Sequence, residues 1–207
     1  MKFTHAIKLI KFRSILMHTI SKKYPGSTQV IIGLDQKIIR NLCSKLSKTG
    51  IVSPAAFNSK NQTLISGDVK TVEKMIFLSK KLGAKKIVNL NIDTPLHCKY
   101  MKEISKKMFL ALNKITFYSP IFPIINNVDV KCEFYSEKIK KALVRQLYNP
   151  VRWEETINLI ISYKIHSIVE VGPGKILSNL NKKIKNITSI SLYKNKNFLL
   201  NIGTKNE

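Results

Sequence analysis

The spacing of histidine and cysteine in this sequence indicates whether they can form a metal site or disulfides. They are scattered singly along the chain: His5, His18, His97, His166, Cys43, Cys98 and Cys132. Metal ligands usually come in close pairs, so this spacing indicates no metal centre. An odd, dispersed set of cysteines also argues against a disulfide framework and indicates a reducing, cytoplasmic environment.

Three polar residues, His97, Gln146 and Arg13, could each be functional or merely structural when taken alone. His97, in the segment Thr94-Pro-Leu-His-Cys98, has a side chain that can exchange a proton near neutral pH, but a lone histidine is more often structural. Gln146 could be a helix-surface glutamine, and Arg13 an exposed arginine on a lysine-rich helix. One detail favours a function for Arg13, because arginine supplies only four of the 36 basic residues.

The segment Gly172-Pro-Gly174 is a candidate phosphate-binding turn. A glycine-rich turn before a helix can cradle a phosphate group. This one lacks both the Walker pattern and the dinucleotide fingerprint. We therefore predict a tight strand-to-helix turn near the functional site.

The elements that must position these residues are clearest between residues 27 and 92. Apolar runs predict strands, and helical periodicity predicts helices. The predicted strands are 29–33, 55–57, 62–65 and 86–90, and the predicted helices are 36–48 and 69–82. The order βαββαβ is that of a ferredoxin-like unit.

The rest of the sequence also alternates helices and strands, which is typical of an α/β layer architecture. The predicted helices are 3–20, one long helix after Pro95 that runs through Leu112, 137–148, 152–163 and one from Lys175. The predicted strands are 167–171 and 188–192, and Pro120 and Pro123 bracket an extended segment that is followed by residues 124–128. Helix 3–20 is expected to be amphipathic, with Phe3, Ile7, Ile10, Ile15 and Leu16 on its apolar face. The end, Lys194 to Glu207, is expected to fray.

The net charge of +24 would suit a nucleic-acid-binding protein. However, the lysines are spread from Lys2 to Lys205, and no basic run is interleaved with aromatic residues. Lysine occurs together with much asparagine and isoleucine, whose codons are also rich in A and T, so genomic base composition explains the charge better. We predict no nucleic-acid partner, although a basic surface would favour an acidic protein or a phosphate-bearing cofactor.

Membrane segments are not predicted either. No apolar run reaches the roughly 18 residues that a membrane span needs. The start of the chain has no continuous apolar region and no small-residue cleavage site, so no signal peptide is expected.

Several runs together resemble one family. They are Pro120 to Glu133 (PIFPIINNVDVKCE), Ala142 to Val151 (ALVRQLYNPV), Val169 to Leu177 (VEVGPGKIL), VIIGLD at 30–35 and FNS at 57–59. In order and spacing they are similar to bacterial malonyl-CoA:acyl-carrier-protein transacylases. The resemblance implies an α/β fold, with a partial α/β-hydrolase-like core and an inserted ferredoxin-like subdomain. It divides the chain into a core helix (1–26), the subdomain (27–92) and the remainder of the core (93–207).

The family resemblance implies a reaction and roles for three residues. Family members move malonyl from coenzyme A to acyl carrier protein through an acyl-serine, in fatty acid biosynthesis and with no cofactor. By resemblance His97 is the base, the main-chain carbonyl of Gln146 orients it, and Arg13 binds the malonyl carboxylate. The chain departs from the family at Leu96, where serine or phenylalanine is usual.

The nucleophile is the largest departure from the family. The sequence has no Gly-x-Ser-x-Gly elbow and no Gly-Gln-Gly-Ser loop, both of which precede the first helix in the family. We therefore expect an N-terminally truncated or split enzyme, inactive and poorly stable alone, with a separate serine-bearing segment as a partner. The alternative is a non-catalytic remnant that only binds acyl carrier protein.

Overall fold

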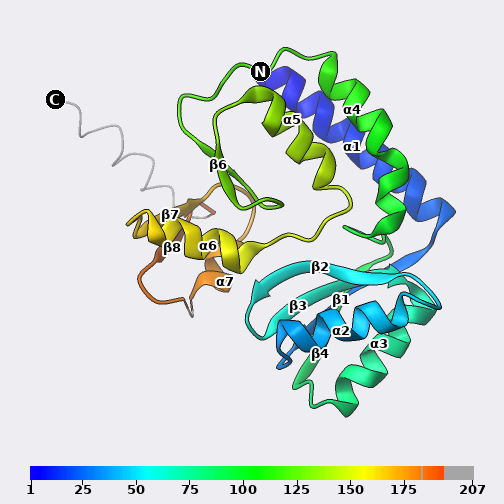
Figure 1. The fold of residues 1–207 in the computed structure, drawn as a ribbon. Helices are drawn as coiled ribbons and strands as arrows, with labels where there is room; N and C mark the ends of the chain where they lie inside the picture. The colour runs from blue at the N-terminus through cyan, green and yellow to red at the C-terminus, as the bar shows by residue number, and fades with distance from the viewer. Residues whose placement is uncertain (183, 194–207) are drawn as a thin grey trace. The chain divides into compact units, whose positions relative to one another are not determined.

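Four antiparallel strands form the sheet that the sequence predicts best (Figure 1). The computed structural model describes residues 1–182 and 184–193. Its strands are β1 Gly26–Ile32, β2 Val52–Ser59, β3 Gln62–Asp68 and β4 Lys86–Ile92. They lie in the order β2-β3-β1-β4. Helix α2 (Gln36–Leu46) follows β1 and α3 (Val69–Lys81) follows β3, so the predicted ferredoxin-like unit is confirmed.

The two helices of this unit pack on the sheet around their own core. Aspartates cap both helix starts, because the side chain of Asp35 accepts from Lys37 N and that of Asp68 from Thr71 N. The core is formed by eight buried side chains: Ile31, Leu34, Ile39, Cys43, Val52, Ile65, Val72 and Met75. All eight belong to residues 26–92, so this unit buries a hydrophobic core of its own.

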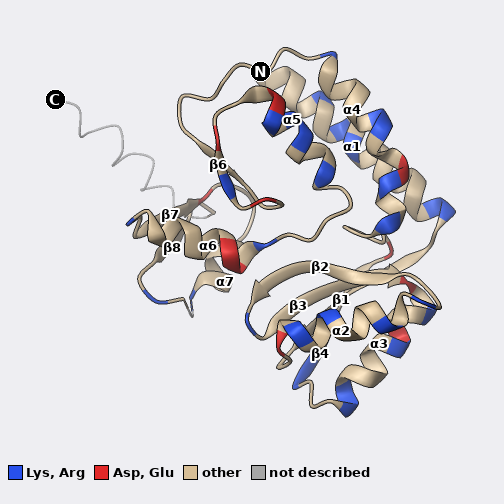
Figure 2. Ribbon diagram, viewed as in Figure 1, with Lys and Arg blue, Asp and Glu red and all other residues tan. Residues whose placement is uncertain are grey.

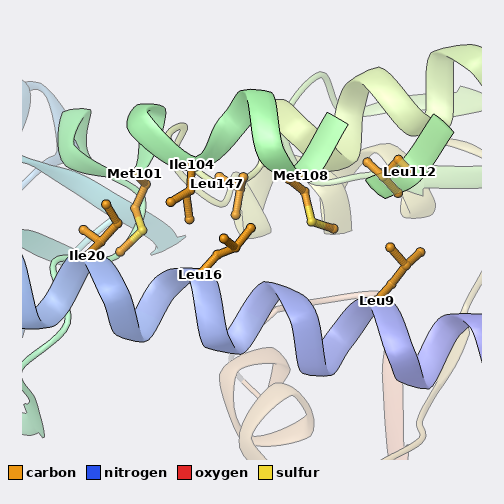
Figure 3. Close-up of a cluster of buried hydrophobic side chains, with 8 residues drawn as sticks. All are labelled: Leu9, Leu16, Ile20, Met101, Ile104, Met108, Leu112 and Leu147. Atoms are coloured by element: carbon orange, nitrogen blue, oxygen red, sulfur yellow. The ribbon is translucent and has the colours of Figure 1, made fainter. Parts of the chain in front are cut away.

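A second core lies between α1 (Phe3–Lys23) and the segment after β4 (Figure 3). The single helix predicted after Pro95 is wrong in detail, since a 3₁₀-helix, η1 (Lys99–Ile104), precedes α4 (Ser105–Asn113). Residues of α1, η1, α4 and the chain after α5 meet in this core: Leu9, Leu16, Ile20, Met101, Ile104, Met108, Leu112 and Leu147. It fixes α1, which carries Arg13, against the segment that follows His97.

The apolar face predicted for α1 is wrong at four of its five residues. Phe3, Ile7, Ile10 and Ile15 are 79%, 50%, 61% and 54% exposed, whereas Leu16 is buried as predicted. The helix carries apolar residues on two faces, so periodicity alone does not identify the buried face. One face packs in the second core, and the other is open in this chain.

A short hairpin and one helix complete the first compact unit, Met1–Thr156. Strands β5 (Ile124–Asn126) and β6 (Lys131–Glu133) pair antiparallel and precede α5 (Ser136–Arg145). The chain then returns to the four-stranded sheet, where Val151 forms a parallel bridge with Ala56. Helix α6 (Trp153–Ser162) begins next.

The second unit, Ile157–Glu207, contains a small βαβ motif. Strands β7 (Ser167–Glu170) and β8 (Thr188–Ser191) pair in parallel, and α7 (Ile176–Asn181) connects them. The carboxylate of Glu170 accepts from the N–H groups of Leu177 and Ser178 at 3.0 and 2.9 Å. Because a carboxylate already occupies this helix start, the structure does not favour a phosphate cradle there, and the predicted tight turn stays a prediction.

The predicted fraying of Lys194 to Glu207 lies outside the described residues. The division into core segments 1–26 and 93–207 stays a prediction. Among the helices that the structure describes, none is both long and apolar enough to cross a membrane.

Candidate active site

His97 lies in the loop between β4 and η1, in a conformation that the sequence does not reveal. Its φ angle is +54°, in the left-handed region, which costs a non-glycine residue about 1–3 kcal/mol and occurs often at functional sites. The loop is held on both sides of His97, because Leu96 N donates to Thr94 O and Cys98 Sγ to Pro95 O. The surrounding structure therefore fixes the imidazole in place.

The ring nitrogen Nδ1 of His97 lies 2.8 Å from the main-chain carbonyl oxygen of Gln146. A carbonyl can only accept, so Nδ1 carries the hydrogen, and in the neutral ring Nε2 has the free lone pair. Burial and the nearby charge of Arg13 lower the pKa of His97, although backbone hydrogen bonds with Gln146 and Asn149 oppose this. At neutral pH the side chain is therefore a neutral base.

Gln146 is placed at the end of α5, not within the predicted helix 137–148. The helix ends at Arg145, and Gln146 is its C-cap, with its own N–H still bonded to Ala142 O at 2.9 Å. The last carbonyls of a helix have no partner within the helix. The Gln146 carbonyl is thus available to accept from His97.

Arg13 reaches the same residue from α1. Its Nη1 donates to the side-chain oxygen Oε1 of Gln146 at 3.2 Å. Burial lowers the pKa of Arg13. Its Nε is buried and has no hydrogen-bond partner among the described residues. A guanidinium held by a neutral amide keeps its full positive charge, which suits an anionic ligand.

The structure thus brings all three predicted site residues together, and it adds one that sequence reasoning missed. The side-chain Nε2 of Gln146 donates to Oδ1 of Asn127 at 2.8 Å. Asn127 belongs to the run Pro120 to Glu133 that carries part of the resemblance. That run marked the segment but not this side chain.

A cavity of about 280 Å³ adjoins these amides. Apolar side chains of β5 and α5 line most of it, including Ile124, Ile139 and Leu143, and Asn127 and Gln146 also line it. The cavity has the mixed character of a small-molecule site, apolar with a few polar groups.

Cys98, next to His97 in the sequence, is not a nucleophile at neutral pH. Burial raises the pKa of Cys98 to about 11, so its thiol is protonated at neutral pH. The thiolate is the nucleophilic form, and Cys98 is therefore inert here. Within the described part of the chain, no group of three or more His, Cys, Asp or Glu could hold a metal ion.

Basic residues lie on many elements of the described chain. Figure 2 shows lysine and arginine on each of α1, α2, α3, α4 and α5. This distribution over several helices agrees with a preference for lysine along the whole chain.

Two comparisons place the chain among known proteins, whereas no protein-family model matches it. It is 48% identical over 203 residues to a malonyl CoA-acyl carrier protein transacylase of Buchnera aphidicola, covering 98% of the chain and 65% of the relative. A Coxiella burnetii transacylase structure of the same name matches with TM-score 0.91 and 31% identity, covering 98% of the chain and 65% of that chain. A type II PKS malonyl-transacylase, solved with its acyl-carrier protein, matches with TM-score 0.88 and 39% identity, covering 92% and 62%.

The matches also show what share of the relatives' length this chain covers. The chain spans about three fifths of the length of the curated relatives, between 58% and 65%. The structural similarity confirms the predicted α/β class, with a partial hydrolase-like core and an inserted ferredoxin-like subdomain. By sequence and by fold, the chain belongs to the malonyl CoA-acyl carrier protein transacylase family.

Proposed function

We propose that this chain supplies the base and the carboxylate-binding arginine of a site that moves malonyl from coenzyme A to acyl carrier protein. The observation that carries this proposal is that Gln146 contacts both groups. Its carbonyl lies 2.8 Å from His97 Nδ1, and its side chain lies 3.2 Å from Arg13 Nη1. The names of the relatives supply the substrate and the acceptor.

The chemistry is a double displacement through an acyl-serine. In the first half, a serine hydroxyl attacks the thioester carbonyl, His97 Nε2 takes the hydroxyl proton, and coenzyme A leaves as a thiol with that proton. In the second half, the acyl carrier protein thiol attacks the serine ester. His97 takes the thiol proton and returns it to the serine oxygen.

Arg13 gives this site its preference for a malonyl group. A malonyl thioester carries a free carboxylate, and a guanidinium can bind a carboxylate through two parallel hydrogen bonds. We expect no metal and no cofactor besides the coenzyme A substrate.

The serine is proposed to come from a segment outside these 207 residues, in the same polypeptide or in a separate one. The 207 residues contain no Gly-x-Ser-x-Gly elbow. We expect the chain alone to transfer no malonyl, to bind acyl carrier protein, and to work in the cytoplasm.

Mixing the chain with a separately made serine-bearing segment of a relative tests this proposal. Malonyl transfer to acyl carrier protein should arise only in the mixture, and it should vanish when the segment's serine is changed to alanine. Binding of acyl carrier protein without any transfer would instead support a non-catalytic remnant.

Replacing Arg13 tests the role of the carboxylate. In the active mixture, Arg13→Ala should reduce malonyl transfer by about 10–100-fold more than acetyl transfer, since a charge-assisted hydrogen bond contributes about 1.5–3 kcal/mol. Lys11→Ala, on an exposed residue of the same helix, is the control and should change neither rate. Equal losses with both acyl groups would contradict the role of Arg13.

A further inference from the structure

The side chain of Gln146 forms a second connection in the site, separate from its carbonyl. Its amide nitrogen donates to Asn127 Oδ1 at 2.8 Å, and its amide oxygen accepts from Arg13 Nη1 at 3.2 Å. Its main-chain carbonyl meanwhile accepts from His97. One residue thus holds the base through its backbone and the cation through its side chain.

The orientation of this amide matters because Arg13 can only donate. Gln146 must therefore present its oxygen, not its NH₂ group, to the guanidinium. An acceptor on the opposite side of the amide enforces that choice, and Asn127 Oδ1 is that acceptor. Without it, the amide could rotate and place two donors against each other.

Asn127 is itself well anchored. It follows β5 directly, in a turn that Asn126 stabilises by accepting from Val128 N and Asp129 N at 3.2 and 2.8 Å. The main-chain oxygen of Asn127 accepts from Arg152 N at 3.0 Å. The turn after β5 therefore sets the direction of the Gln146 amide.

The neutrality of this connection has a consequence for ligand binding. A carboxylate in place of either amide would bring a negative charge close to the guanidinium and compete with an anionic substrate. Two amides orient the guanidinium and leave its charge uncompensated.

We infer that Asn127 is a positioning residue that acts through the Gln146 side chain to aim Arg13 at the carboxylate of the acyl group. This inference rests on the proposed function and deepens it. The Gln146 backbone holds His97 independently, so disturbing the amide pair should affect Arg13 and leave the imidazole in place.

Nuclear magnetic resonance can separate the two effects in the intact chain. The sequence has four arginines and four histidines, so the Nε–H signal of Arg13 and the ring nitrogens of His97 can be assigned by single substitutions. In Gln146→Met, which keeps the backbone carbonyl, the Arg13 signal should move while His97 keeps its hydrogen on Nδ1. Asn127→Leu should give the same pattern.

Two further variants serve as controls. Asn127→Asp retains an oxygen acceptor for Gln146, so the Arg13 signal should move less than in Asn127→Leu, whereas the added negative charge should weaken binding of the malonyl carboxylate. Asn113→Leu, at an exposed position of α4, should change neither signal. If Asn127→Leu does not fold, Gln146→Met and Asn127→Asp still carry the test.

The functional readout uses the mixture with the serine-bearing segment. Asn127→Leu and Gln146→Met should lower the preference for malonyl over acetyl by about tenfold, since one hydrogen bond to a charged group is lost. An Arg13 signal that ignores both variants, or a His97 signal that moves equally, would overturn the inference. Absence of transfer in the wild-type mixture would overturn the proposed function alone, because the resonance test needs no catalysis.

Discussion

The hydrogen bond between His97 Nδ1 and the Gln146 carbonyl determines which nitrogen can act as a base. It puts the hydrogen on Nδ1 and leaves Nε2 to accept a proton. The acceptor is a backbone carbonyl, so this orienting group has no charge to lose as pH changes. The titration of the site is therefore expected to follow His97 itself.

The pH dependence of His97 follows from its environment. Burial lowers its pKa below the ordinary 6.5, so the native protein favours the neutral ring while the unfolded chain takes up the proton more readily. The stability that this difference contributes is present above the unfolded pKa and is lost as pH falls through the folded pKa. In a resonance titration, His97 should show a midpoint below 6.5.

Two further measurements check this prediction. Transfer activity in the reconstituted mixture should rise with pH through the same midpoint. His97→Gln should reduce the loss of stability between about pH 7 and about pH 5, as followed by urea unfolding. A His97 midpoint at or above 6.5 would contradict the burial argument.

The resemblance predicted roles for His97, Gln146 and Arg13, whereas residue types alone left each of them ambiguous. Sequence reasoning missed Asn127 because its role depends on a contact with Gln146, 19 positions away. It also missed the left-handed conformation of His97, since no glycine or turn signal marks it. Such features are set by tertiary contacts, not by local sequence.

At the scale of elements, Asp68 connects more of the structure than a helix cap usually does. Oδ1 accepts from Thr71 N at 2.8 Å and caps α3, while Oδ2 accepts from Ile51 N at 2.6 Å at the start of β2. Burial would raise the pKa of Asp68, but these hydrogen bonds lower it on balance. The carboxylate therefore stabilises both a helix and a strand connection.

Replacing this aspartate should destabilise the ferredoxin-like unit. Asp68→Ala should lower the free energy of unfolding by about 2 kcal/mol, at the upper end for a lost cap. Asp35→Ala, which removes only the exposed cap of α2, should cost about 1 kcal/mol or less. Because the folded pKa is depressed, the contribution of Asp68 should be present above the ordinary pKa of 3.8 and lost below it. Equal losses in urea unfolding of the two variants would contradict the double role.

Elements were predictable where the pattern had one reading. The βαββαβ order followed from alternating apolar runs and turns, and only strand ends were misplaced, as in β2, which extends from Val52 to Ser59. The prediction for α1 was wrong about which face is buried, because the apolar residues of this helix lie on two faces. Which face is buried depends on the partner element, and a single helix does not specify that.

At the scale of the whole molecule, the two cores differ in how complete they are. The core of the ferredoxin-like unit draws all its buried residues from 26–92. Those residues produced alone should therefore fold and melt cooperatively by circular dichroism. A non-cooperative melt would show that the unit depends on the rest of the chain.

The face of α1 that lies outside the second core exposes a contiguous row of apolar side chains, Phe3, Ile7 and Ile10. Exposed apolar patches of this kind mark interaction surfaces. We expect the serine-bearing segment to cover this row, since the relatives contain a further two fifths of sequence that this chain does not match. Binding of a hydrophobic dye to the chain should fall as the segment is added.

A matched pair of charge substitutions locates the contact. Ile10→Lys should weaken association with the segment by about tenfold or more, because burying one isoleucine side chain contributes about 1.5–3 kcal/mol. Phe77→Lys alters an equally exposed apolar residue, but on α3 of the ferredoxin-like unit, and should leave the affinity unchanged. If both variants bind equally well, α1 does not form the contact; if both bind equally poorly, the association is a general attraction to apolar surface. Only a loss of affinity in Ile10→Lys without a loss in Phe77→Lys supports a specific binding surface for the segment on α1, the helix that carries Arg13.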